Sequence, residues 1–160
     1  MKKFTIELKW AIIFMASLLI WMFLEKLVGL HDEHIDLHQY VTMLYMIPAI
    51  LIYVLALKDV KSNFYGGKMS YKQGFISGLI ISVIVTVFSP LNQWIISEVI
   101  TPDYFENVIA YSVETGYHEN IEDAKAQFNL ETYIIQSTVW ALGMGIITSA
   151  IVALFVKTKS

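Results

Sequence analysis

The stretch FISGLIISVIVTVFSPLNQWII, residues 75–96, carries no charged side chain over 22 consecutive positions. About 20 apolar residues are enough for a helix to cross roughly 30 Å of hydrocarbon. Backbone amides in lipid must be satisfied within their own segment, so this run is expected to be helical. Three similar runs accompany it, so the sequence predicts an all-α, integral membrane four-helix bundle in a single domain, 1–160. The expected spans are about 10–30, 40–57, 75–97 and 133–156.

The composition agrees with a membrane protein, because 56% of the residues are hydrophobic and only 16% are charged. The first run follows Lys2 and Lys3, as the core of a signal peptide would, but no small-x-small cleavage site precedes its polar boundary. We therefore expect it to be retained as a span. The absence of cysteine excludes disulfides, thiolate metal sites and cysteine nucleophiles.

The charged residues are sorted between the segments that separate these runs. Twelve of the 14 acids, all but Glu7 and Asp59, fall on one predicted side. Nine of the 11 lysines fall in segments that would share the other side: Lys2, Lys3, Lys9, Lys58, Lys61, Lys68, Lys72, Lys157 and Lys159. Under the positive-inside rule this asymmetry predicts a multi-pass membrane protein with both termini in the cytoplasm.

The segment 98–132, between the last two runs, is predicted to form a short helical cap on the extracytoplasmic side. It contains eight acids and one lysine. Thr101 followed by Pro102 is typical of a helix start, and Gly116 is placed to end that helix. Asn120, with Asp123 three residues later, predicts a second start. The acidity of the segment 98–132 disfavours binding to anionic lipid headgroups. We therefore expect this segment to pack on the outer ends of the spans.

Small residues recur at four-residue intervals in the last two runs. Small side chains let helix backbones approach closely in lipid. Two interpretations stay open: the ridges join the two spans within one chain, or either ridge forms a homodimer. The main residues of the two ridges are Gly74, Gly78 and Ser82, and Ala141, Gly145 and Ser149.

Three of the four histidines lie in the short outer loop HDEHIDLH, residues 31–38. If this loop is helical, offsets of three and seven residues bring the imidazoles within about 60° of one another. Such a face can offer nitrogen ligands to zinc, and neighbouring acids can add oxygen ligands. The alternatives are a hydrated polar turn and a pH-sensing cluster. The candidate metal ligands are His31, His34, His38, Asp32 and Asp36.

A second set of polar residues lies near the predicted outer ends of the spans: Glu25, Asn92, Gln93 and Gln136. An ionisable side chain at such depth is a functional candidate, because exposure to lipid is costly. The residues could line one polar outer pocket. They could instead be interfacial side chains that form hydrogen bonds between helices.

Three stretches identify a resemblance: GLHDEHIDLH (29–38), YGGKMSYKQGFISG (65–78) and ITPDYFENVIAYSVETGY (100–117). The chain resembles an uncharacterised family of small bacterial membrane proteins, a domain of unknown function. The resemblance covers nearly the whole chain and implies a four-span protein of the inner membrane of Gram-negative bacteria. It implies no activity and no catalytic residue.

We find no phosphate-binding glycine loop, His-Glu-x-x-His or Gly-x-Ser-x-Gly in the sequence. We therefore expect a non-enzymatic accessory, scaffold or interaction subunit without a cofactor. Its expected partners are the lipid bilayer and either a protein met through the acidic cap or a second copy, and not nucleic acid. The alternative is a cation-binding transporter or sensor that uses the outer cluster of His, Asp and Glu residues.

Overall fold

The computed structural model describes residues 2–158, and every regular element in that range is helical. The elements are α1 (Lys3–Leu27), α2 (Ile35–Thr42), the 3-10 turn η1 (Met43–Tyr45), α3 (Met46–Asn63), α4 (Tyr71–Trp94), the π-helical turn η2 (Ile95–Ile100), α5 (Tyr104–Glu114), α6 (Ile121–Gln127) and α7 (Leu130–Val156). Lys159, part of the predicted lysine-rich tail, lies outside the described residues. The predicted all-helical bundle with a helical cap is confirmed.

Four helical segments are long and apolar enough to cross a membrane: Lys3–Leu27, Ile35–Asn63, Tyr71–Ile100 and Ile121–Val156. The second segment contains the 3-10 turn η1 just before Pro48. Proline has no N–H to bond the carbonyl one turn back, so a local tightening at this point is expected. The chain is therefore a multi-pass membrane protein.

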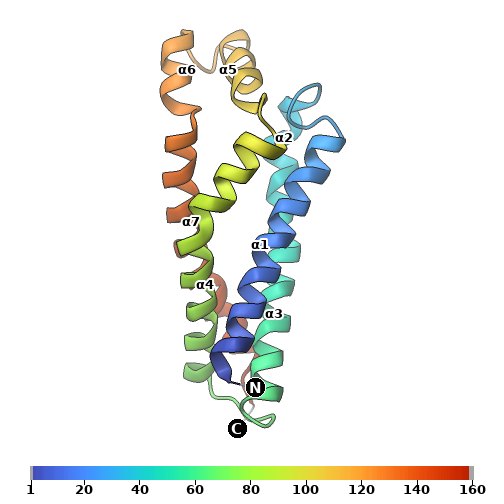
Figure 1. The fold of residues 1–160 in the computed structure, drawn as a ribbon, viewed down its shortest axis with the longest axis vertical. Helices are drawn as coiled ribbons and strands as arrows, with labels where there is room; N and C mark the ends of the chain where they lie inside the picture. The colour runs from blue at the N-terminus through green and yellow to red at the C-terminus, as the bar shows by residue number, and fades with distance from the viewer. Residues whose placement is uncertain (1, 159–160) are drawn as a thin grey trace.

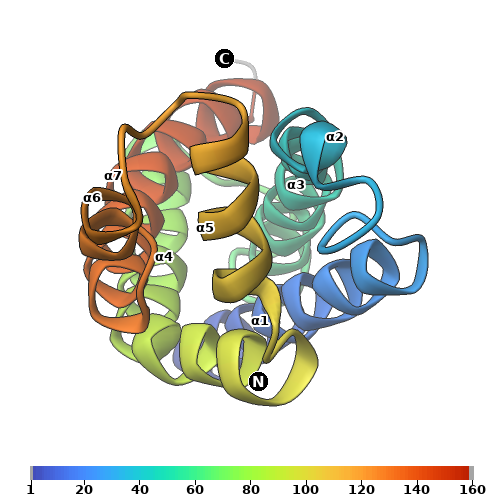
Figure 2. The same cartoon turned by 90° about the horizontal axis from the view of Figure 1, so that it is seen from above.

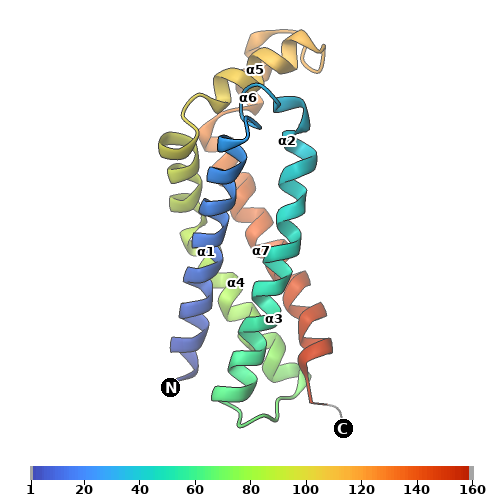
Figure 3. The ribbon, with the colours of Figure 1, turned by 90° about the vertical axis from the view of Figure 1, so that its right-hand side faces the viewer.

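The four long helices run side by side, and both ends of the chain lie at the same end of the bundle (Figures 1 and 3). We call this the lysine end, and the opposite end, which carries α5 and α6, the cap end. Viewed from the cap end, α5 crosses the middle of the bundle (Figure 2). The predicted helical cap therefore lies over the ends of the spans.

The two small-residue ridges face each other between α4 and α7. A Cβ atom added at Gly78 would lie 2.7 Å from the Cβ of Ser149, and one added at Gly145 would lie 2.6 Å from the Cβ of Ser82. The two serine hydroxyls lie 3.3 Å apart, and that of Ser82 also lies 2.8 Å from the Tyr53 hydroxyl. Glycine is needed at both positions because the neighbouring backbone approaches too closely for a side chain.

The two acids on the lysine-rich side each pair with a lysine. Asp59 of α3 binds the ammonium group of Lys9 and accepts a 2.7 Å hydrogen bond from the indole of Trp10. Glu7 is buried and lies 3.1 Å from Lys3, one turn earlier in α1. Asp59 thereby holds α1 against α3 at the lysine end.

The route from α4 to the cap is bent. The upper part of α4, which contains Pro90, leans away from α7 (Figure 1). The wide turn η2 follows, and the Thr101 hydroxyl donates to the carbonyl of Ile96 at 2.9 Å. The prediction that Thr101 caps the next helix is wrong, because α5 begins at Tyr104 and Thr101 instead closes η2.

The other two cap signals are confirmed. Gly116 has a φ of 74° immediately after the end of α5, a conformation that favours glycine. Asn120 precedes α6, and its side chain accepts a 2.9 Å hydrogen bond from the backbone N–H of Asp123.

Candidate metal centre

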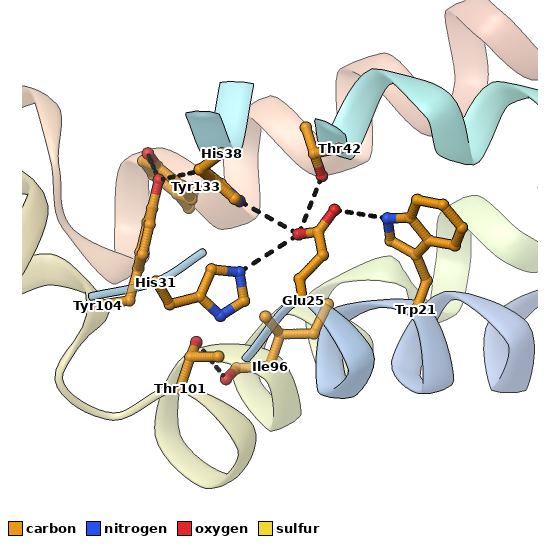
Figure 4. A network of polar contacts seen from close by, with 9 residues as sticks. All are labelled: Trp21, Glu25, His31, His38, Thr42, Ile96, Thr101, Tyr104 and Tyr133. Atoms are coloured by element: carbon orange, nitrogen blue, oxygen red, sulfur yellow. Dashed lines mark hydrogen bonds and ion pairs between the residues drawn. The ribbon is translucent and has the colours of Figure 1, made fainter. Parts of the chain in front are cut away.

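Three side chains from separate parts of the first hairpin meet at the cap end. Glu25 lies in the last turn of α1, His31 in the loop that follows, and His38 in α2. The loop turns sharply at Gly29, whose φ is 76°, and the backbone N–H of Leu30 bonds the carbonyl of Glu25. This turn reverses the chain and brings both imidazoles to the Glu25 carboxylate (Figure 4).

The geometry at the carboxylate is symmetrical. Oε2 of Glu25 lies 3.3 Å from Nε2 of His31 and 3.3 Å from Nε2 of His38. One ligand atom from each of the three residues lies within 4.8 Å of the others. Glu25 and His31 are 2% and 4% exposed, so bulk water contributes little to either group.

Hydrogen bonds fix the orientation of the carboxylate. The indole N–H of Trp21 donates to Oε1 of Glu25 at 2.5 Å, and the Thr42 hydroxyl donates to Oε2 at 3.3 Å. Both donors come from helices, one turn before Glu25 in α1 and at the end of α2. The carboxylate is therefore held in one position before anything binds to it.

The cap supplies a second layer of contacts through α5. The hydroxyl of Tyr104 lies 3.3 Å from Nδ1 of His38 and 3.4 Å from the hydroxyl of Tyr133 (Figure 4). The side-chain amide of Asn107 donates to the carbonyl of His31 at 2.9 Å. Burial raises the pKa of Tyr104 above its ordinary value, so its hydroxyl stays neutral and available for hydrogen bonding.

Two imidazole nitrogens at the site make no hydrogen bond among the described residues, although one of them, Nε2 of His38, lies 3.3 Å from Oε2 of Glu25. These are Nδ1 of His31 and Nε2 of His38, both buried. Buried polar atoms are normally satisfied, so such atoms call for an explanation. A tetrahedral zinc ion with ligands at about 2.0–2.1 Å places neighbouring ligand atoms about 3.3 Å apart. The separations between Glu25 and the two histidines fit that spacing.

Two cavities adjoin the site. The smaller, of about 210 Å³, is lined by His38, Thr42, Tyr104 and Tyr133 among others. The larger, of about 600 Å³, lies between the spans. A metal ion held by Glu25, His31 and His38 would therefore have space beside it for a fourth ligand.

The structure separates the predicted metal residues into two groups. His31 and His38 join the cluster, whereas His34, Asp32 and Asp36 are exposed and lie outside it. The run 31–38 is not one helix, because α2 begins at Ile35. His31 and His38 meet because the chain turns at residues 31–34 before α2 begins, and not through helical spacing.

The predicted outer pocket is also divided. Asn92 and Gln93 line the 600 Å³ cavity, and Gln93 lines the smaller one as well. Glu25 belongs to the histidine cluster, and Gln136 is exposed and lines neither cavity. The sequence reasoning missed Trp21, Thr42 and the two tyrosines, since nothing in their local sequence distinguishes them from interface residues.

Comparison with known proteins identifies the family of the chain but no activity for it. A family model described as "Protein of unknown function (DUF4199)" matches residues 9–158. No curated protein and no solved structure matches the chain.

Proposed function

We propose that this chain, which belongs to the DUF4199 family, binds a zinc-class metal ion. The family is described as of unknown function, and the proposal rests on the geometry of the site. The observation that carries the proposal is the convergence of Glu25, His31 and His38 at ligand distances in a buried position. In this proposal the protein is a non-enzymatic metal receptor or sensor of a bacterial inner membrane.

The donor set supports a transition metal over calcium or magnesium. Two imidazole nitrogens and one carboxylate oxygen suit zinc and neighbouring metals, whereas calcium and magnesium prefer oxygen ligands alone. Metal ligands are usually oriented by hydrogen bonds to a second layer of residues. Here Tyr104 contacts Nδ1 of His38, and the Trp21 indole and the Thr42 hydroxyl donate to Glu25.

The charge distribution supports an outward-facing site. Lys68 in the loop 64–70, Lys2 and Lys3 at the start of α1, and Lys157 at the end of α7 lie at the lysine end, which the positive-inside rule assigns to the cytoplasm. Both termini are then cytoplasmic. The metal centre, at the cap end, would face the extracytoplasmic side and respond to metal there.

We propose binding without catalysis. The residues in hydrogen-bond contact with the cluster, Trp21, Thr42, Tyr104 and Asn107, carry indole, hydroxyl or amide groups. Metal-assisted hydrolysis also needs a general base near the bound water. The one carboxylate at the centre, Glu25, is used as a ligand.

Isothermal titration calorimetry with zinc chloride on the purified protein tests the proposal. The native chain should bind one equivalent, and His31→Ala and His38→Ala should each weaken binding about 10- to 100-fold or more. His34→Ala is the matched control, because this exposed histidine lies in the same loop outside the cluster. An absent heat for the native chain, or equal losses in all three variants, would contradict the metal centre.

A second candidate function is that of an accessory subunit whose protein partner binds the cap. Tyr117, between α5 and α6, is 69% exposed, and Ile121, the first residue of α6, is 55% exposed. Six exposed acids lie on the same segment: Asp103, Glu106, Glu114, Glu119, Glu122 and Asp123. An acidic surface with two exposed apolar side chains suits a basic partner with an apolar anchor.

Photo-crosslinking in native membranes tests this second function. A benzoylphenylalanine at position 117 should capture one specific neighbour, whereas the same probe at position 64, which is exposed at the lysine end, should not. A homodimer would need a surface other than the small-residue ridges, since these contact each other. The mass of the crosslinked species distinguishes a second copy from another protein, and no product from position 117 would refute a partner at the cap.

A further inference from the structure

The 600 Å³ cavity is lined by residues of all four spans. Phe14 of α1, Ala49 of α3, Asn92 of α4 and Ala141 of α7 each contribute to its wall. Its volume falls in the range of small-molecule sites, about 300–1,000 Å³. It therefore offers space for a ligand inside the membrane-spanning part of the protein.

The rim of this cavity faces the lipid. Met43 and Met46, on and next to η1, are 68% and 53% exposed, and Trp140 of α7 is 65% exposed. All three line the cavity. At the depth of the spans, exposed side chains meet hydrocarbon and not water. Because the wall is mainly apolar, a hydrocarbon chain is the matching occupant.

The larger cavity adjoins the smaller one, whose wall carries more polar groups. Leu18, Thr42, Gln93 and Ile96 line both, and the smaller cavity ends at His38, Tyr104 and Tyr133. Thr42 also donates to Glu25 in the metal cluster. The two cavities thus lie side by side between the lipid-facing rim and the metal centre.

We propose that the two adjoining cavities join to bind one long-chain carboxylate, a fatty acid, with its chain between α3 and α7 and its head group beside His38. The choice of head group rests on the proposed metal function. A dication held by one carboxylate and two neutral imidazoles keeps one net positive charge in a buried place. A carboxylate oxygen neutralises that charge and completes the tetrahedron. The hydroxyls of Tyr104 and Tyr133 can donate to its second oxygen.

A scintillation proximity assay with radiolabelled palmitate on the tagged, detergent-solubilised protein tests the proposal. Palmitate should bind saturably, and Ala49→Phe, which fills the cavity, should weaken binding about tenfold or more. Ala16→Phe is the matched control, because Ala16 is an exposed alanine of α1 outside the cavity wall, and it should bind as the native chain does. Retained size-exclusion profiles establish that both variants are folded.

Two further measurements distinguish the contribution of the hydrocarbon chain of the ligand from that of its carboxylate head group. Methyl palmitate, which lacks the charge, should compete weakly, and removal of zinc should weaken palmitate binding but not methyl palmitate binding. Equal binding of the two probes would overturn the head-group assignment, and insensitivity to Ala49→Phe would overturn the cavity. If calorimetry shows zinc binding but palmitate does not bind saturably, the fatty-acid proposal alone is refuted. Saturable, Ala49→Phe-sensitive palmitate binding without any zinc heat refutes the metal centre alone.

Discussion

At the scale of single residues, the hydroxyl of Tyr104 is the contact through which the cap reaches the ring of His38. It lies 3.3 Å from Nδ1 of His38 while Nε2 of the same ring faces Glu25. A partner on the distal nitrogen fixes the tautomer and the direction of a ligating imidazole. Tyr104 is thus a positioning residue for His38.

Tyr104→Phe should lower zinc affinity about tenfold while leaving the stoichiometry at one. The ring and its packing remain, so the loss reports the hydroxyl alone. Calorimetry checks the affinity, and Tyr111→Phe, a partly buried tyrosine of the same helix, is the control. Unchanged affinity in Tyr104→Phe would remove the positioning role.

Residue identity alone predicted part of the site. A dense run of histidines beside acids pointed to His31 and His38, which the structure brings together, and metal binding itself stays a prediction. Glu25 was placed in a different pocket, because its meeting with the histidines depends on the φ of Gly29 and on the direction of α2. Sequence spacing encodes neither quantity.

At the scale of the elements, contact between α4 and α7 is the closest helix pairing in the bundle. Small residues on each helix let the backbones approach, and the two serine hydroxyls bond both their own helix and each other. Interhelical contact of this kind replaces the hydrophobic effect, which is absent between helices in lipid.

Gly145→Ala should destabilise the protein by about 1–3 kcal/mol, since the new Cβ would overlap the Ser82 side chain. Gly143→Ala is the control two residues away, where a Cβ meets nothing within 4 Å. Alanine there should stabilise the helix by about 1 kcal/mol or less. Thermal unfolding in detergent, followed by circular dichroism, gives the order of melting temperatures, and equal melting of the two variants would contradict the close approach.

Local sequence signals predicted the long helices and two helix ends correctly and one helix start wrongly. Apolar runs located the four long helices, and the Asn120 and Gly116 signals were correct because capping depends on neighbours in sequence. The Thr101 signal failed because the backbone after Pro90 widens into η2, and Thr101 then bonds backward to Ile96. A tertiary bend overrode a local preference.

At the scale of the whole molecule, charge sorting and architecture agree. The two acids that break the sorting, Glu7 and Asp59, are paired with lysines within the bundle and so add no unpaired negative charge at the lysine end. The bias that orients a multi-pass protein comes from lysines near the ends of the spans.

Single-cysteine labelling can test the orientation, because the chain has no cysteine of its own. Tyr117→Cys, at the exposed cap, should react with a membrane-impermeant maleimide in intact cells. Ser62→Cys, exposed at the lysine end, should react only after the membrane is permeabilised. The reverse pattern would invert the proposed topology and place the metal centre in the cytoplasm.

The two hydrogen-bond contacts of α5 have a kinetic consequence. Asn107 bonds the backbone of His31 and Tyr104 contacts the ring of His38, so one helix lies across both imidazoles. An ion bound at the proposed centre would exchange with the aqueous phase when that helix lifts. Its residence time would then depend on the opening frequency of the cap, a local unfolding event, separately from the strength of the metal–ligand bonds.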